Sequence, residues 1–266
     1  MARRHKRKRK NKLYRKVKLI FWLLVMLLGL LAYQAYVSLT RPFVQSNVPA
    51  PAIQTTGTGA ALNYVVMGDS LAAGAGGNYQ QGIALATSKY LAKNHQVTMT
   101  NLAGAAIRSD NVISDQLAKA AKLKPDLVLL VMGGDDLAHL VLPSKWQLNL
   151  ERIIVGLRKD NCQVRIVVTG APALGTSPRF AFPLRVIVGL ASDELNRRYI
   201  RTIQQSSSIF ANVASTGQTF SAHPEDYASD GFHPSTQGYD VLVNAIDPAL
   251  GKAIASQDHC PVKPSV

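Results

Sequence analysis

The strongest constraint on how this chain can fold is an uninterrupted apolar stretch close to its N-terminus. Residues 19–37, LIFWLLVMLLGLLAYQAYV, contain a single strongly polar side chain, Gln34. As a helix rising about 1.5 Å per residue, the stretch is roughly 28 Å long, close to the hydrocarbon thickness of a bilayer. It therefore predicts one N-terminal transmembrane helix.

A strongly basic tail precedes this stretch. Residues 1–18 carry eleven Lys and Arg and no acidic residue. By the positive-inside rule the tail stays cytoplasmic, which places residues 38–266 outside the membrane. A cleaved signal peptide is the main alternative, but its apolar core is usually about 7–15 residues, and no convincing cleavage site follows here. We favour an uncleaved, single-pass anchor in the cell membrane.

The net charge belongs mostly to the tail. Of the total of +14, residues 1–18 supply eleven, which leaves +3 for the remaining 248 residues. A nucleic-acid partner is therefore not expected. The tail is better explained as a topology signal that also contacts anionic lipid.

Beyond the anchor, the composition divides the chain into a linker and one folded domain. Residues 38–61 are rich in Pro, Thr, Ser and Gly without a periodic apolar face, which predicts a linker. The domain is expected to span 62–258, followed by a tail at 259–266. Five apolar runs in it predict strands at 62–67, 96–102, 126–132, 164–170 and 208–214. They alternate with helical patterns, which predicts an α/β three-layer sandwich with a five-stranded parallel sheet in flavodoxin-like order.

Three polar residues are expected at the ligand-binding edge of this sheet. In open parallel sheets, ligands bind beyond the carboxyl ends of the strands. Ser70 follows the first strand in YVVMGDSLAAGAG, and Asp230 and His233 lie three residues apart in DGFHP before the last helix. Each fragment alone is more often a structural turn or cap. Together they supply a nucleophile, a base and a carboxylate that orients the base.

Four blocks of this sequence resemble the SGNH, or GDSL-type, hydrolase family of esterases and lipases. They are MGDSLAAGAG, NLAGAAIRSD, VMGGDDL and DGFHPSTQGY, within roughly residues 62–256. The first and last are specific, whereas the second depends on one glycine. The resemblance implies Ser70 as nucleophile, His233 as general base and Asp230 as its orienting partner. It also implies oxyanion-hole donors at the N–H groups of Ser70 and Gly104, and no requirement for a cofactor or metal.

The third block departs from the family pattern. The family usually has Gly-x-Asn-Asp there, and the Asn side chain donates a hydrogen bond to the oxyanion; alignment on Gly133 places Asp135 at that position. An ionised carboxylate cannot donate and repels developing negative charge. Three interpretations are open: a protonated Asp135 that donates, a side chain turned away, or a site reused for binding. A metal held by Asp135 and Asp136 is less favoured, because adjacent carboxylates rarely converge on one ion.

Two further features lie outside the four blocks. Cys162 precedes the fourth predicted strand and Cys260 follows the last helix, so both fall at the opposite edge of the sheet. A disulfide bond between them is geometrically reasonable, and two free thiols fit the count almost as well. The segment 176–196 is expected at the catalytic edge. Its aromatic and aliphatic side chains suit an acyl-chain wall, a flap against the membrane or, slightly favoured, a plug for the domain's own core.

The sequence thus predicts a membrane-anchored, extracytoplasmic serine ester hydrolase. Its location points to ester substrates of the cell envelope, such as O-acetylated glycans or acylated lipids. Two alternatives remain: an acyltransferase, and a non-catalytic domain that binds envelope glycan on the same fold. Asp135 favours the binding domain, whereas an intact Ser70, His233 and Asp230 set argues against it. The oligomeric state is not defined by the sequence.

Overall fold

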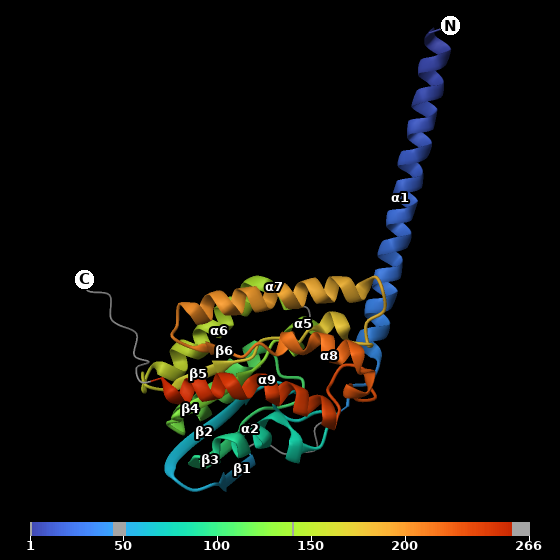
Figure 1. Cartoon of the computed structure of the whole chain (residues 1–266). Coiled ribbons are helices and arrows are strands. Elements are labelled where there is room, and N and C mark those ends of the chain that lie inside the picture. Colours follow the sequence, from blue (N-terminus) through green and yellow to red (C-terminus); the bar gives the residue numbers. More distant parts are fainter. Residues whose placement is uncertain (1, 45–51, 140, 257–266) are drawn as a thin grey trace, which may run out of the picture.

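The structure is a computed structural model that describes residues 2–44, 52–139 and 141–256. It consists of a long N-terminal helix, α1 (Ala2–Thr40), and an α/β domain built on one central sheet (Figure 1). The helix α1 projects away from the end of the domain at which α7 begins. The strands are β1 (Ala52–Thr56), β2 (Ala60–Gly68), β3 (His95–Asn101), β4 (Leu127–Val131), β5 (Arg165–Val168) and β6 (Ile209–Phe210).

The remaining elements are α-helices and short 3₁₀ or π segments. The longer helices are α2 (Ile83–Leu91), α6 (Pro143–Arg158), α7 (Leu184–Gln204) and α9 (Thr236–Ala255). The short helices are α3 (Ser109–Asn111), α4 (Ala118–Lys122), α5 (Gly134–Ala138) and α8 (Gly217–Ala222). The π segment is η2 (Val112–Leu117), and the 3₁₀ turns are η1 (Tyr79–Gln81), η3 (Leu174–Thr176), η4 (Val213–Thr216) and η5 (Pro224–Asp226).

The sheet has six strands in the order β1-β3-β2-β4-β5-β6. The last five of that order are mutually parallel and correspond to the five predicted strands. The prediction of an all-parallel, five-stranded sheet is corrected by β1, which pairs antiparallel with β3 from Ala52 opposite Asn101 to Thr56 opposite Val97. This strand lies in the segment predicted as a linker. It is a short, largely exposed edge strand that satisfies the backbone groups of β3, so it carries no apolar pattern.

Helices cover both faces of the sheet, as a buried parallel sheet requires. Side chains alternate along each strand: Tyr64 and Val66 of β2 face α2 and α9, whereas Val65 and Met67 face α6 and α7. All four are fully buried. The apolar clusters on the two faces of the sheet therefore fix the register of β2, and with it the position of Gly68 at the end of the strand.

The helix α1 is exposed along most of its apolar length. Residues Lys12–Thr40 are long and apolar enough to cross a membrane, a test that a signal sequence near an N-terminus also passes. The helix continues beyond the predicted end at residue 37, and its last turns pack on the domain. The Gln34 amide donates to the Phe182 carbonyl oxygen at 2.7 Å and accepts from the Leu184 N–H at 3.1 Å. The first residues of the predicted linker, Ser38–Thr40, are thus helix, and the Ser38 hydroxyl donates to the domain at the Arg179 carbonyl oxygen.

The cysteines were expected at the edge of the sheet opposite the site. Cys162 lies in the turn before β5, as predicted. Cys260 lies outside the described residues, so the disulfide bond stays a prediction.

Candidate active site

The turn that carries Ser70 is held on both sides by backbone and side-chain contacts. Gly68 ends β2 with φ +135°, and a Cβ atom there would collide with the Val131 carbonyl oxygen, so only glycine fits. The Gln116 side chain accepts from the Gly68 N–H at 2.8 Å and donates to the Gly68 oxygen at 2.9 Å. The sequence did not reveal Gln116, which lies in the π segment η2. The position of Ser70 is therefore preset by the sheet.

The structure brings Ser70, His233 and Asp230 together in one chain of hydrogen bonds. The His233 Nε2 atom lies 2.8 Å from the Ser70 Oγ atom, and Nδ1 lies 2.6 Å from Asp230 Oδ2. All three residues are at most 6% exposed. Since a carboxylate only accepts, Nδ1 carries the proton, and the unprotonated Nε2 faces the serine hydroxyl. This is the arrangement that a general base needs to take the serine proton.

Asp230 is kept ionised despite its burial. Burial raises the pKa of its carboxyl, but four hydrogen bonds outweigh it, and the pKa falls below the ordinary value. One comes from the His233 side chain. Backbone N–H groups provide the others, from Phe232 at 2.9 Å, Val44 at 3.0 Å and His233 at 3.0 Å. A permanently charged Asp230 can stabilise the imidazolium that forms when His233 takes a proton.

The segment that follows α1 forms part of this site. The Phe43 ring packs edge-on against the His233 ring, with 5.8 Å between the centroids, and the Val44 N–H reaches Asp230. The buried Arg179 guanidinium lies 3.7 Å from the centroid of the Phe43 ring. We did not predict these contacts, because residues 38–44 carry no motif. The only signal was an arginine between apolar residues in SPRFAF.

Arg179 joins α1, this segment and the loop of Asp230. Its guanidinium donates to the carbonyl oxygens of Ser38 at 2.8 Å, Asp230 at 3.1 Å and Arg41 at 2.5 Å. The Ser38 hydroxyl donates in return to the Arg179 carbonyl oxygen at 3.3 Å. The end of α1 and the loop that carries Asp230 and His233 are thus fixed relative to each other through one side chain.

We expect Arg179→Met to reduce both stability and turnover. It leaves three carbonyl oxygens without their donor, which should lower the free energy of unfolding by about 1–3 kcal/mol. It also loosens Phe43 and Asp230, so kcat should fall about tenfold with little change in KM. Urea unfolding and ester kinetics of the full chain in detergent measure both. Arg185→Met, at an exposed position of α7, is the matched control; equal kcat values in the two variants would contradict a positioning role.

Of the two backbone N–H groups predicted to form the oxyanion hole, that of Gly104 has another partner. The Gly104 N–H donates to the Gly68 oxygen at 3.3 Å, a long hydrogen bond. The Ser70 N–H lies close enough to the Asp135 carboxyl to lower its pKa. Asp135 therefore lies beside the serine, where the aligned Asn was expected, and is not turned away. Burial raises its pKa, opposed by His233, His139 and the Ser70 N–H.

Asp135 belongs to a group of three buried carboxyls, with Asp69 and Asp136. In the described parts of the chain, one oxygen of each has no hydrogen-bond partner. The second oxygen of Asp69 accepts from the Leu71 N–H at 3.0 Å, and that of Asp136 accepts from the Ser109 N–H at 3.1 Å. Burial raises the pKa of all three, and that of Asp69 is well above its usual range because the Asp135 charge adds to burial. Within the described residues, no cluster of His, Cys, Asp or Glu could hold a metal ion.

The raised pKa of Asp69 predicts a loss of stability at high pH. The folded protein binds this proton more tightly than the unfolded chain does. Stability therefore falls as pH rises from about 4 through the folded pKa. The substitution Asp69→Asn keeps an oxygen that can accept from the Leu71 N–H. It should raise the free energy of unfolding by more than about 1 kcal/mol at pH 8. This increase should vanish as pH falls to about 4 and below, where the wild-type carboxyl becomes protonated in the unfolded chain as well as in the folded one. Urea unfolding across pH measures this gain; a pH-independent difference would contradict it. The exposed Asp193→Asn is the control.

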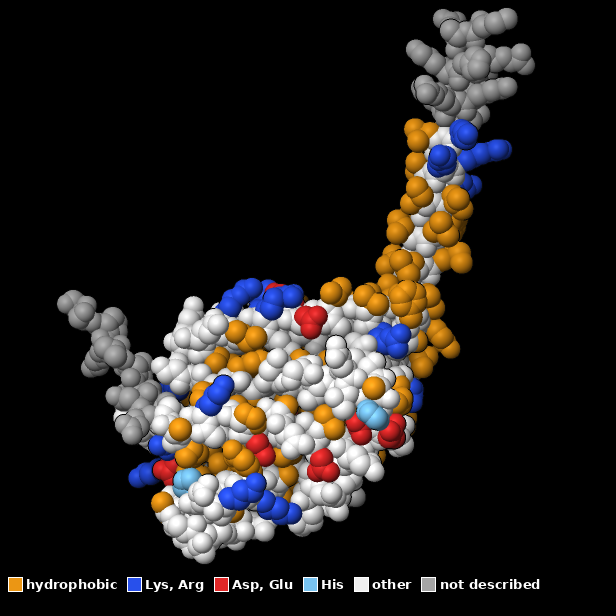
Figure 2. Space-filling model, viewed as in Figure 1, with side chains coloured by type: hydrophobic (Ala, Val, Ile, Leu, Met, Phe, Trp, Pro, Cys, Tyr) orange, Lys and Arg blue, Asp and Glu red, His pale blue; other side chains and the backbone are white. Residues whose placement is uncertain are grey.

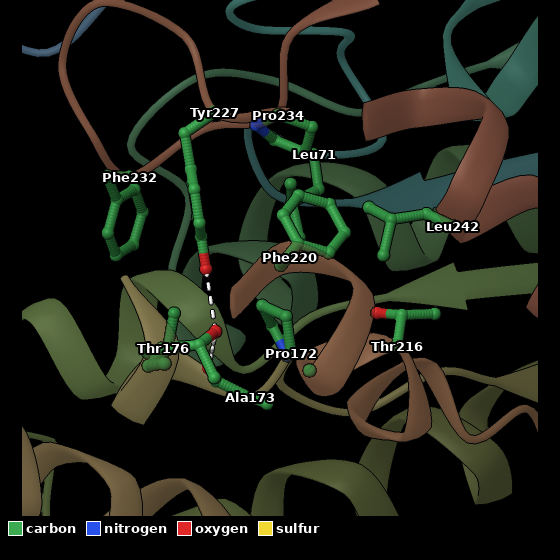
Figure 3. Close-up of a pocket in the computed structure, with 12 residues that line it drawn as sticks. Leu71, Pro172, Ala173, Thr176, Thr216, Phe220, Tyr227, Phe232, Pro234 and Leu242 are labelled. Carbon is green, nitrogen blue, oxygen red and sulfur yellow. Dashed lines mark hydrogen bonds between the residues drawn. The ribbon is translucent and has the colours of Figure 1, made fainter. Parts of the chain in front are cut away.

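A small apolar pocket lies beside the loop that carries Asp230 and His233 (Figure 3). Phe232 and Pro234, on either side of His233, face it together with Leu71, the residue after Ser70. The Tyr227 hydroxyl is hydrogen-bonded to the Thr176 hydroxyl at 2.8 Å across its rim. The pocket thus lies among the residues next to Ser70 and His233 and has a mainly apolar lining.

The fold is shared with solved structures of hydrolases. The structure of TesA matches with a TM-score of 0.60 and 21% identity, over 72% of this chain and 99% of TesA. A variant of Axe2, an acetyl-xylooligosaccharide esterase from Geobacillus, matches with a TM-score of 0.58 and 17% identity, over 76% and 100%. Phospholipase A1 from Streptomyces albidoflavus matches with a TM-score of 0.57 and 17% identity, over 73% and 100%. These identities establish the fold alone.

Sequence comparison identifies the family. A search of curated protein sequences gave no significant match to this chain. The sequence profile of the GDSL-like Lipase/Acylhydrolase family matches residues 66–241, which include Ser70, Asp230 and His233. The chain therefore belongs to the GDSL-like lipase/acylhydrolase family, whose members act on ester bonds.

Proposed function

We propose that this protein is a membrane-anchored serine ester hydrolase in which Ser70, His233 and Asp230 are the catalytic residues. The observation that carries the proposal is the continuous hydrogen-bond chain from Ser70 Oγ through His233 to Asp230. In this mechanism Ser70 Oγ attacks the ester carbonyl carbon as its proton moves to His233 Nε2. The alcohol leaves with that proton, and water then releases the acyl group from Ser70 with His233 again as base.

The oxyanion hole is the weak part of this site. A developing oxyanion next to Ser70 would find the Ser70 N–H and, once it is released from Gly68, the Gly104 N–H. The carboxylate of Asp135 stands where a third donor is expected and repels the negative charge. We therefore propose a slow hydrolase at neutral pH, whose rate is limited by Asp135.

The location is part of the proposal. The length and apolar surface of α1 and the basic tail before it support a single span with a cytoplasmic N-terminus. The domain would then lie outside the membrane and act on esters of the cell envelope. Carbonate extraction of membranes tests the anchor, because a cleaved signal peptide would leave the domain in the soluble fraction.

The enzymatic proposal is tested by a fluorophosphonate probe, which reacts with activated serine nucleophiles. The full chain in detergent should be labelled at Ser70, and Ser70→Ala should not be labelled. The Gly104 N–H, which is engaged with Gly68, and the carboxyl of Asp135 favour a second candidate, a glycan-binding domain without activity. A folded chain that neither reacts with the probe nor hydrolyses p-nitrophenyl esters, but binds envelope glycan, would support that second function.

A further inference from the structure

A second apolar pocket lies at the corner where α1 meets the domain. It is enclosed by α1, the segment after it, α5, η3 and the start of α7. Its lining residues are Ala35, Ser38, Leu39, Phe43, Leu137, Ala138, Leu174, Arg179, Phe180, Leu184 and Val188. The family profile begins at residue 66, so the wall supplied by α1 is additional to the hydrolase domain.

This pocket shares a wall with the catalytic residues. Phe43 lines it and also packs against the ring of His233. Leu137 and Ala138 line it from α5, the helix that also carries Asp135. An occupant of the pocket would therefore lie within one side-chain layer of the triad.

The polar groups of the lining residues are directed at the protein itself. Apart from backbone atoms, only Ser38 and Arg179 contribute polar groups to the lining. The Ser38 hydroxyl donates to the Arg179 carbonyl, and the Arg179 guanidinium donates to the carbonyls of Ser38, Asp230 and Arg41. A sugar ring requires several free hydrogen-bonding groups from its site, whereas a hydrocarbon chain requires only apolar walls.

The surface around the corner is apolar as well. Four exposed hydrophobic side chains, Phe182, Val186, Ile187 and Leu190, lie in or just before the first two turns of α7. Figure 2 shows hydrophobic side chains along the α1 rod and at the domain surface where the rod meets it. In Figure 1, α7 runs across the side of the domain from which α1 departs. If α1 spans a bilayer, this face lies next to the lipid headgroups.

We propose that the α1–α7 pocket binds the hydrocarbon chain of a lipid ester that enters from the adjoining leaflet. This inference rests on the proposed ester hydrolase function and names its substrate class. Because the apolar pocket adjoins the catalytic residues at one corner of the domain, the site would favour long-chain acyl or alkyl esters over acetylated glycans. The continuity of the pocket with the apolar face of α1 and α7 explains how such a chain reaches it without crossing water.

The test compares chain lengths and blocks the pocket. The full chain in detergent should hydrolyse p-nitrophenyl octanoate with a higher kcat/KM than p-nitrophenyl acetate. Val188→Trp should lower kcat/KM for octanoate roughly tenfold to a hundredfold and leave acetate within about twofold, because each buried methylene contributes to binding. Val155→Trp, at an exposed valine of α6 that does not line the pocket, is the matched control and should change neither.

The outcomes separate the two proposals. If no ester is hydrolysed and the fluorophosphonate probe does not react, the hydrolase function itself fails. If acetate is hydrolysed at least as well as octanoate, or if Val188→Trp reduces both esters equally, the hydrolase stands and the lipid pocket is wrong. Binding of the fluorescent fatty acid cis-parinaric acid to Ser70→Ala gives a readout without turnover. Val188→Trp introduced into Ser70→Ala should abolish this binding, and unchanged binding would overturn the proposal.

Discussion

Ser70→Ala should reduce ester hydrolysis by at least about 10³-fold. Removing a serine nucleophile from a serine–histidine–aspartate triad costs about 10³- to 10⁶-fold in kcat. The Ser70 Oγ atom is hydrogen-bonded to His233 Nε2, so it is the hydroxyl from which this base can take a proton. The measurement is kcat for p-nitrophenyl butyrate with the full chain in detergent.

The control for this prediction is Ser215→Ala, an exposed serine away from the triad, which should retain full activity. Asp230→Asn provides a second arm, because it keeps the shape but favours the wrong tautomer of His233. A loss of about 10³- to 10⁴-fold is expected there. If Ser70→Ala is folded and keeps more than a tenth of the activity, the triad is not the catalytic device.

Asp135→Asn should raise kcat about tenfold to a hundredfold at pH 8. The substitution removes a negative charge beside the serine and introduces an amide that can donate to the oxyanion. One such donor is worth about 10²–10³-fold in turnover. The Asp135 carboxyl is buried and lies near the Ser70 N–H, so the new amide needs no change of backbone. The control is Asp193→Asn, an exposed acidic residue of α7.

The pH dependence of this gain has a definite sign. Burial raises the pKa of Asp135, and below that pKa the wild-type side chain is neutral and can donate its own proton to a hydrogen bond. The advantage of Asp135→Asn should therefore shrink as pH falls. A variant that is slower than the wild type at every pH would show that the carboxyl is useful to the reaction, for instance as a protonated donor.

The close approach of Ser70, His233 and Asp230 could be predicted because these residues carry local signals. The close approach of the Val131 carbonyl oxygen requires glycine at position 68, so the Gly-Asp-Ser turn can be recognised in the sequence. Asp230 and His233 lie three apart in one stiff loop. The apolar runs predicted the five parallel strands because a strand buried on both faces shows its burial directly in composition.

The remaining parts of the site had no such signal. Val44 contributes a backbone N–H, which any residue except proline carries, so its bond to Asp230 leaves no trace in the sequence. Gln116 contacts Gly68, which is 48 positions away in the sequence. Arg179 contacts Arg41 and Ser38, which are 138 and 141 positions away, and only the folded chain brings these residues together. The strand β1 is exposed at an edge and was hidden in a segment with linker composition.

The contact between α1 and the catalytic loop has a consequence for where the reaction can take place. Proteolytic shedding of the domain before β1 would remove the Val44 N–H from Asp230 and the Phe43 ring from His233. It would also strip Arg179 of the carbonyl partners at Ser38 and Arg41. If α1 anchors the chain as proposed, a released domain would therefore be a poorer enzyme than the anchored one, and hydrolysis would stay confined to the cell that makes the protein.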